Sequence, residues 1–190
     1  MTAVAGYPTG DLSAYIGMTV PDFLPDSLRL LFVGINPGLV TAATQTHFGK
    51  RGNRFYPALV AAGILPRLPV IDGTPGDVQA LLGAAGLGIT SIVPIATAGE
   101  SGLTVTQKRE GAAVLVEKIA RLRPPVVAVL GLGAYRDAFG MPHAVAGEQP
   151  QGIAGSRLWL LPNPSGLNAH ESVASLAAAY AEPARAAGIL

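Results

Sequence analysis

The apolar residues of this chain gather in short, nearly unbroken runs. Four runs have the length of a strand, and turn-forming residues follow each one: residues 29–34, 88–93, 126–131 and 157–162. An uninterrupted apolar run is typical of a strand that is buried on both faces, as in a parallel sheet. The pattern therefore predicts four buried strands.

Between these runs the apolar spacing changes to that of amphipathic helices. The clearest case is residues 104–122, where apolar side chains recur at a helical period and two prolines end the segment. Strands that alternate with helices indicate an α/β domain with a central, mostly parallel four-stranded sheet. Shorter helices are predicted over residues 53–62, 132–139 and 172–187.

The same pattern predicts the domain organisation. Residues 1–27 have few apolar runs, and we interpret them as an N-terminal arm before a single domain over residues 28–190. Segments 35–52 and 64–76 are predicted as loops. The longest uncharged run, residues 78–99, contains four glycines and a proline, so we expect a helix end and a strand rather than a membrane span.

Composition and charge narrow the chemistry. The 190 residues include no Cys, which excludes iron–sulfur clusters, thiol catalysis and Cys-ligated zinc, and the three His lack metal-ligand spacing. The formal net charge is +1, but residues 27–71 contain no acidic residue and five basic ones. Such a segment can bind an anion, with chance clustering as the alternative.

Two of the predicted strands end in similar loops. GINPG (Gly34–Gly38) follows the first strand and NPSGLN (Asn163–Asn168) follows the last. Carboxyl ends of parallel strands share one edge of a sheet, so both loops are expected to face one cleft. An Asn side chain is no general base near neutral pH, but its donors and acceptor can orient a water. Each motif alone also fits a tight strand-end turn.

Together the motifs carry a resemblance. GINPG followed by NRFY, and later LPNPSGLN, resembles the mismatch-specific uracil-DNA glycosylase family, the group of bacterial Mug and thymine-DNA glycosylase. The likeness covers about residues 30–180. It implies a three-layer α/β/α sandwich of the uracil-DNA glycosylase type. It also implies a monofunctional enzyme that flips uracil out of mismatched DNA and hydrolyses its glycosidic bond, with thymine and other damaged bases as alternative substrates.

The resemblance implies roles for individual residues. Asn36 is expected to position the attacking water, and Phe48 to stack on the flipped base. The backbone near Ile35 and the side chain of Asn53 are expected to line the base pocket. The wedge into the duplex is expected from the second motif, at Ser165, Gly166, Leu167 and Asn168. The basic residues that flank the first motif, Lys50, Arg51 and Arg54, are expected to meet phosphates, with a solvated surface loop as the alternative. Accessory groups are Glu100, Asn163 and His170.

The sequence departs from some relatives after the wedge leucine. Asn168, Ala169 and His170 stand where those relatives carry Ser-Arg, so one basic contact is missing. Other branches of the superfamily use an acidic residue in the first motif, a catalytic His in the second, or four Cys. Asn36, Asn163 and the lack of Cys fit those branches poorly.

Two other functions stay open from the residues alone. The first is a small-nucleotide-binding α/β enzyme, for which VLGLGAYR (129–136) is the best support, although Arg136 stands where the dinucleotide motif needs Gly or Ala. The second is a non-catalytic binder of DNA lesions. For the glycosylase we expect a monomer in the cytoplasm that acts on double-stranded DNA, with no membrane, metal or cofactor.

Overall fold

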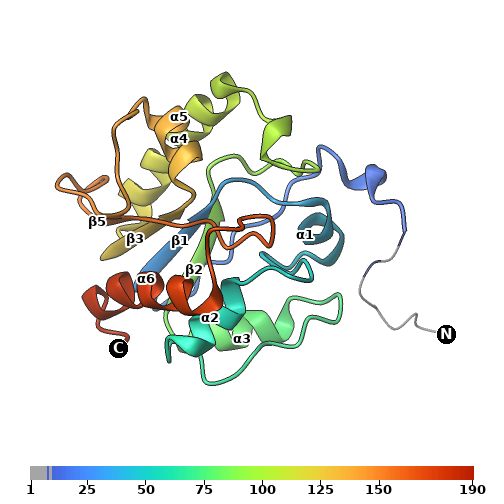
Figure 1. Ribbon diagram of the computed structural model, residues 1–190, viewed down its shortest axis with the longest axis horizontal. Coiled ribbons are helices and arrows are strands. Elements are labelled where there is room, and N and C mark those ends of the chain that lie inside the picture. Colours follow the sequence, from blue (N-terminus) through green and yellow to red (C-terminus); the bar gives the residue numbers. More distant parts are fainter. Residues whose placement is uncertain (1–7, 9) are drawn as a thin grey trace.

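The structure is a computed structural model that describes residue 8 and residues 10–190. Within these residues a five-stranded sheet forms the centre, in the order β2-β1-β3-β5-β4 (Figure 1). The first four strands of this order are mutually parallel, and β4 pairs antiparallel with β5. The strands are β1 (Leu30–Gly34), β2 (Leu87–Ser91), β3 (Val126–Leu130), β4 (Gly147–Glu148) and β5 (Arg157–Leu161).

Helices cover both faces of the sheet, which gives the expected three layers. One face packs against α2 (Phe55–Ala61), α3 (Gly76–Ala84) and α6 (Val173–Ala186). The opposite face packs against α4 (Val105–Leu122) and α5 (Leu132–Phe139). None of the helices in the described part of the chain is long and apolar enough to cross a membrane.

The prediction of a mostly parallel sheet with four buried strands is confirmed, but the strand number was wrong. The fifth strand, β4, has two residues and no apolar pattern, so no periodicity could reveal it. One short helix was also missed, because the predicted loop over residues 35–52 contains α1 (Leu39–Thr44). The helix end expected within residues 78–99 is that of α3, which begins at the end of the loop predicted over 64–76.

Alternating side chains of the strands build the two halves of the core. In β1, Leu30 and Phe32 face the layer of α2, α3 and α6, whereas Leu31 and Val33 face α4 and α5. The Phe32 ring meets the Phe55 ring edge-on, with 5.1 Å between centroids. Because Phe55 is the first residue of α2, this contact fixes the start of α2 against the central strand.

The register of the parallel strands aligns their carboxyl ends. Gly34 lies beside Ser91, and Leu130 lies beside Leu161. The loops after β1, β2, β3 and β5 therefore emerge along one edge of the sheet. Part of the segment predicted as an arm lies alongside the domain, since Thr19 and Phe23 form bridges with Ile95 and Ile89.

Candidate active site

A cleft of 430 Å³ opens at the carboxyl edge of the sheet. Its size is typical of a small-molecule or base pocket. The loops after β1, β2 and β5 line it, together with residues 47–53. Most of the predicted site residues are in this lining: Ile35, Asn36, Phe48, Lys50, Asn53, Glu100, Asn163, Ser165, Leu167 and Asn168.

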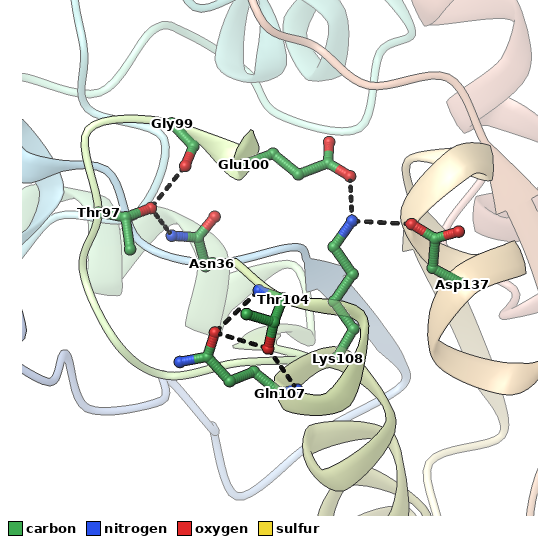
Figure 2. A network of polar contacts seen from close by, with 8 residues as sticks. All are labelled: Asn36, Thr97, Gly99, Glu100, Thr104, Gln107, Lys108 and Asp137. Carbon is green, nitrogen blue, oxygen red and sulfur yellow. Dashed lines mark hydrogen bonds and ion pairs between the residues drawn. The ribbon is translucent and has the colours of Figure 1, made fainter. Parts of the chain in front are cut away.

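The side chain of Asn36 is held in one orientation. Its Nδ2 donates to the backbone oxygens of Pro37 and Ile95, at 3.1 and 3.2 Å, and to the Thr97 hydroxyl at 2.7 Å. All three partners accept, so the nitrogen of the amide must face them. Oδ1 then points away from Thr97, as Figure 2 shows. The first loop thus presents a hydrogen-bond acceptor to the cleft.

Asn53 and Asn163 are held the other way round. The Oδ1 of Asn53 accepts from the backbone N–H of Phe55, the first residue of α2, at 2.9 Å. The Oδ1 of Asn163 accepts from the N–H of Ser165, also at 2.9 Å. In both residues the oxygen is used inside the loop. Nδ2 therefore remains as the group that each residue can offer to a ligand in the cleft.

Phe48 forms an aromatic wall of the cleft. Its backbone has φ of 57°, and its ring stacks on Phe55 with 4.2 Å between centroids. A Cβ on Gly34 would lie only 3.3 Å from the Phe48 ring, so the glycine at the end of β1 leaves room for it. The ring is half-buried, and a planar base in the cleft could contact it.

His47, the neighbour of Phe48 in the chain, also lines the cleft. It is buried, and one ring nitrogen, Nε2, lies 2.9 Å from the backbone oxygen of Pro21. Burial lowers the pKa of His47 below its ordinary value, because the charged imidazolium would lose its hydration. This residue is therefore a neutral hydrogen-bond donor at pH 7.

The loop after β5 carries the predicted wedge. Leu167 is 88% exposed at the rim of the cleft. The loop lies against the 49–53 segment so closely that a Cβ on Gly166 would be 2.8 Å from the Gly52 oxygen. A side chain at position 166 would force the two loops apart.

Arg54 does not have the role that we predicted for it. Its guanidinium donates to the backbone oxygens of Glu171, Ser165 and Asn168, and its N–H donates to the Pro164 oxygen. It is turned into the protein and holds the loop after β5 instead of meeting phosphates. The sequence could not reveal this because its partners are carbonyl groups more than 100 residues away.

The remaining basic candidates are divided between the cleft and its surroundings. Lys50 is exposed and lines the cleft. Arg51 and His170 are exposed but lie outside the cleft lining. Glu100 lines the cleft, and its Oε1 accepts from the Lys108 Nζ at 3.0 Å, while the same nitrogen pairs with Asp137 at 2.9 Å (Figure 2).

The glycine-rich turn after β3 has a packing role. Gly131 has φ of 125°, and a Cβ there would lie 3.0 Å from the Ile35 Cδ1. Arg136 donates to the Ala144 oxygen at 2.7 and 3.0 Å. These contacts explain the turn without a bound nucleotide. Among the described residues, no three His, Asp or Glu side chains lie together as possible metal ligands.

Comparison with protein families agrees with this geometry. The model of the uracil DNA glycosylase superfamily matches residues 21–183, most of the chain. The chain belongs to the uracil DNA glycosylase superfamily. Members of this superfamily hydrolyse the N-glycosidic bond of uracil in DNA, and this class of DNA-repair activity is assigned to the chain.

The cleft of this protein also contains residues that we did not predict from the sequence. Ser91, at the end of β2, lines the cleft beside Gly34. Thr97 lines it as well and binds Asn36. Both lie in a stretch of ordinary polar and apolar residues, where no motif marks them. Only the pairing of β1 with β2 brings them to the first loop.

Proposed function

We propose that this glycosylase is of the mismatch-specific type and removes uracil from U·G pairs in double-stranded DNA. The observation that carries the proposal is the held amide of Asn36, with Nδ2 tied to three acceptors and Oδ1 left toward the cleft. A water that donates to Oδ1 has a fixed place from which to attack the sugar.

Asn36 provides position rather than base strength. During hydrolysis the bond between the sugar C1′ and the base nitrogen breaks, and its electron pair leaves with the base. Water adds to C1′, and the proton that it loses passes to the departing base anion, directly or through solvent. A neutral amide does not take up the water's proton, whereas a general base is worth roughly 10²- to 10⁴-fold in rate. Catalysis then rests on orientation and electrostatics, and we expect a slow enzyme.

The amide donors of the cleft suit the leaving base. Uracil departs with negative charge on its nitrogen and carbonyl oxygens. Asn53 and Asn163 both present Nδ2 because their oxygens accept backbone N–H groups. Preorganised donors aimed at a developing negative charge stabilise the transition state. Phe48 supports the same base by stacking.

Mismatch preference follows from the cost of flipping. A base must leave the helix before it can enter the cleft, and this costs less at a mismatch. The exposed Leu167 is suited to fill the vacated stack, as apolar wedges do in other DNA-binding proteins. A weak catalyst with such a wedge works best on bases that are already poorly paired.

The test is strand scission of an end-labelled duplex with one U·G pair, treated with alkali after incubation. U·A duplex, single-stranded uracil DNA and a T·G duplex are measured alongside. We expect cleavage at uracil, fastest for U·G. Asn36→Ala should lower the rate by about 10²- to 10³-fold, the range for loss of one key polar group at a reacting centre, with unchanged DNA binding.

Three outcomes would contradict the proposal. If Asn36→Ala cuts as fast as the wild type, Asn36 does not position the water. If U·A is cut as well as U·G, the mismatch preference is wrong. If the protein binds the duplex and leaves every tested base in place, it is a lesion binder rather than an enzyme for these substrates.

A further inference from the structure

We propose that Thr97 is the positioning residue that sets which atom of the Asn36 amide faces the cleft. The inference rests on the proposed role of Asn36 in holding the attacking water. It concerns a different residue, on the segment that follows β2.

The hydroxyl of Thr97 has only one way to bind Asn36. Its proton is donated to the Gly99 oxygen at 2.7 Å, as Figure 2 shows. The hydroxyl can therefore only accept from Asn36, at 2.7 Å, the shortest of the three contacts of Nδ2. An Oδ1 turned toward Thr97 would place two acceptors against each other. This excludes the flipped amide.

The Thr97 side chain itself has little freedom. A Cβ on Gly102 would lie 3.2 Å from the Thr97 Cβ, so the 3₁₀ turn Glu100–Gly102 packs directly against it. The Thr97 N–H donates to the Pro37 oxygen at 3.2 Å, which ties the segment to the first loop. Thr97 thus holds Asn36 from a backbone that is bonded to the same loop.

The segment of Thr97 is also fastened to the helical layer. Lys108 on α4 is 8% exposed at its side chain and pairs with Glu100 at 3.0 Å and with Asp137 on α5 at 2.9 Å (Figure 2). Glu100 directly follows Gly99, whose oxygen receives the Thr97 proton. A chain of contacts therefore leads from two helices through Glu100 and Thr97 to Asn36.

The experiment compares two substitutions at one position. Thr97→Val keeps the shape of the side chain and removes the hydroxyl, whereas Thr97→Ser keeps the hydroxyl. Single-turnover excision of uracil from a U·G duplex and the Kd for a duplex with an uncleavable uracil analogue are measured for both. We expect Thr97→Val to slow excision by about 10- to 100-fold, the size of effect that misplacement of a reacting group produces, with Kd within about twofold. Thr97→Ser should stay close to the wild type.

Thr90→Val is the matched control. The Thr90 hydroxyl is buried, donates to Asp22 at 2.6 Å and accepts from Lys118 at 2.9 Å. The same substitution there removes a comparable hydrogen-bonded hydroxyl without contact to Asn36. Thr90→Val should lower thermal stability at least as much as Thr97→Val does and leave excision unchanged.

A double variant separates positioning from a general structural effect. In an Asn36→Ala background no amide remains to be oriented, so Thr97→Val should slow the residual reaction no further. A further tenfold loss in that background, or excision at the wild-type rate by Thr97→Val alone, overturns the inference. Wild-type protein that cuts no uracil would instead contradict the proposed function, so the two failures are distinguishable.

Discussion

Asn36 and Asn163 each follow a buried parallel strand and precede a proline, yet they face the cleft with opposite atoms. Asn36 gives its nitrogen to Pro37, Ile95 and Thr97 and keeps its oxygen for the cleft. Asn163 gives its oxygen to the Ser165 N–H and keeps its nitrogen. The same two-residue motif therefore supplies an acceptor on one side of the cleft and a donor on the other.

The difference comes from what surrounds each loop. The first loop lies beside the segment after β2, whose carbonyl and hydroxyl oxygens surround the Asn36 amide. The last loop turns back on itself, so its own N–H reaches Asn163. The loops also differ in support, because the first is tied to a neighbouring strand end, whereas the last depends on Arg54. A motif specifies residue types, whereas the groups around each loop decide whether an Asn side chain offers a donor or an acceptor to the cleft.

The largest effect is expected from removing the support of the last loop. Arg54→Gln deletes three charge-assisted hydrogen bonds to carbonyl groups, each worth roughly 1.5–3 kcal/mol. Water replaces part of this, so we expect a loss of about 3 kcal/mol in the free energy of unfolding. If the loop after β5 carries the proposed wedge, excision from duplex DNA should fall more than excision from single strands, because a wedge acts only in a duplex.

Arg136→Gln is the control for that measurement. Arg136 also donates to a backbone oxygen, that of Ala144, but away from the cleft. It should lower the denaturation midpoint without changing the ratio of duplex to single-strand excision. An unchanged ratio in Arg54→Gln would mean that Arg54 does not hold the wedge.

A pair of substitutions tests the opposite orientations of the Asn36 and Asn163 side-chain amides. Asn36→Asp places a carboxylate oxygen against two carbonyl oxygens and should cost about 1–3 kcal/mol in unfolding free energy at pH 7. In Asn163→Asp the new carboxylate still accepts from the Ser165 N–H, so the unfolding free energy should change by less than about 0.5 kcal/mol. Urea denaturation of both variants is the measurement, and equal costs would contradict the assigned orientations.

The wall of the cleft that contains Phe48 also carries a group that links folding to pH. His47, next to Phe48, is buried, and burial lowers its pKa. An unfolded chain takes up the His47 proton near pH 6.5, its ordinary pKa, but the folded chain resists it. Stability is therefore full above this pH and falls as the pH drops below it, by at most about 1.4 kcal/mol per unit.

Denaturation of His47→Gln and of the wild type between pH 7.5 and 5 tests this linkage. The variant should have a flatter dependence of unfolding free energy on pH than the wild type. Parallel curves for the two proteins would show that the His47 proton is not linked to folding.

The smallest effect on stability is expected at the wedge itself. Leu167 is 88% exposed, so Leu167→Ala should change the unfolding free energy by less than about 0.5 kcal/mol. We expect it nevertheless to slow U·G excision in duplex DNA by about tenfold, since flipping costs a few kcal/mol and a wedge offsets part of that cost. Val145→Ala, at a residue that is 65% exposed outside the cleft, is the control. Unchanged duplex excision would remove Leu167 from the mechanism.

Local patterns in the sequence were sufficient to predict the mostly parallel sheet and the sheet edge at which the cleft lies, whereas the three layers were implied by the family resemblance. The strands β1, β2, β3 and β5 are buried on both faces, apart from Arg157 at the start of β5, and such burial is typical of a parallel sheet. Helix ends were predictable where side chains cap them, as Thr104 does for α4. The two-residue β4 and the six-residue α1 escaped because each contains fewer than two periods of its pattern, so no repeat can be recognised.

The sequence by itself therefore determined the residue types at the cleft: two Asn-Pro turns, an aromatic residue, a lone exposed leucine and their order along the chain. The tertiary structure decided what each polar atom does. Arg54 binds carbonyl groups more than 100 residues away, and Thr97 reaches Asn36 only because β1 and β2 pair. A hydrogen bond depends on the position of both partners, and a linear pattern contains the position of neither.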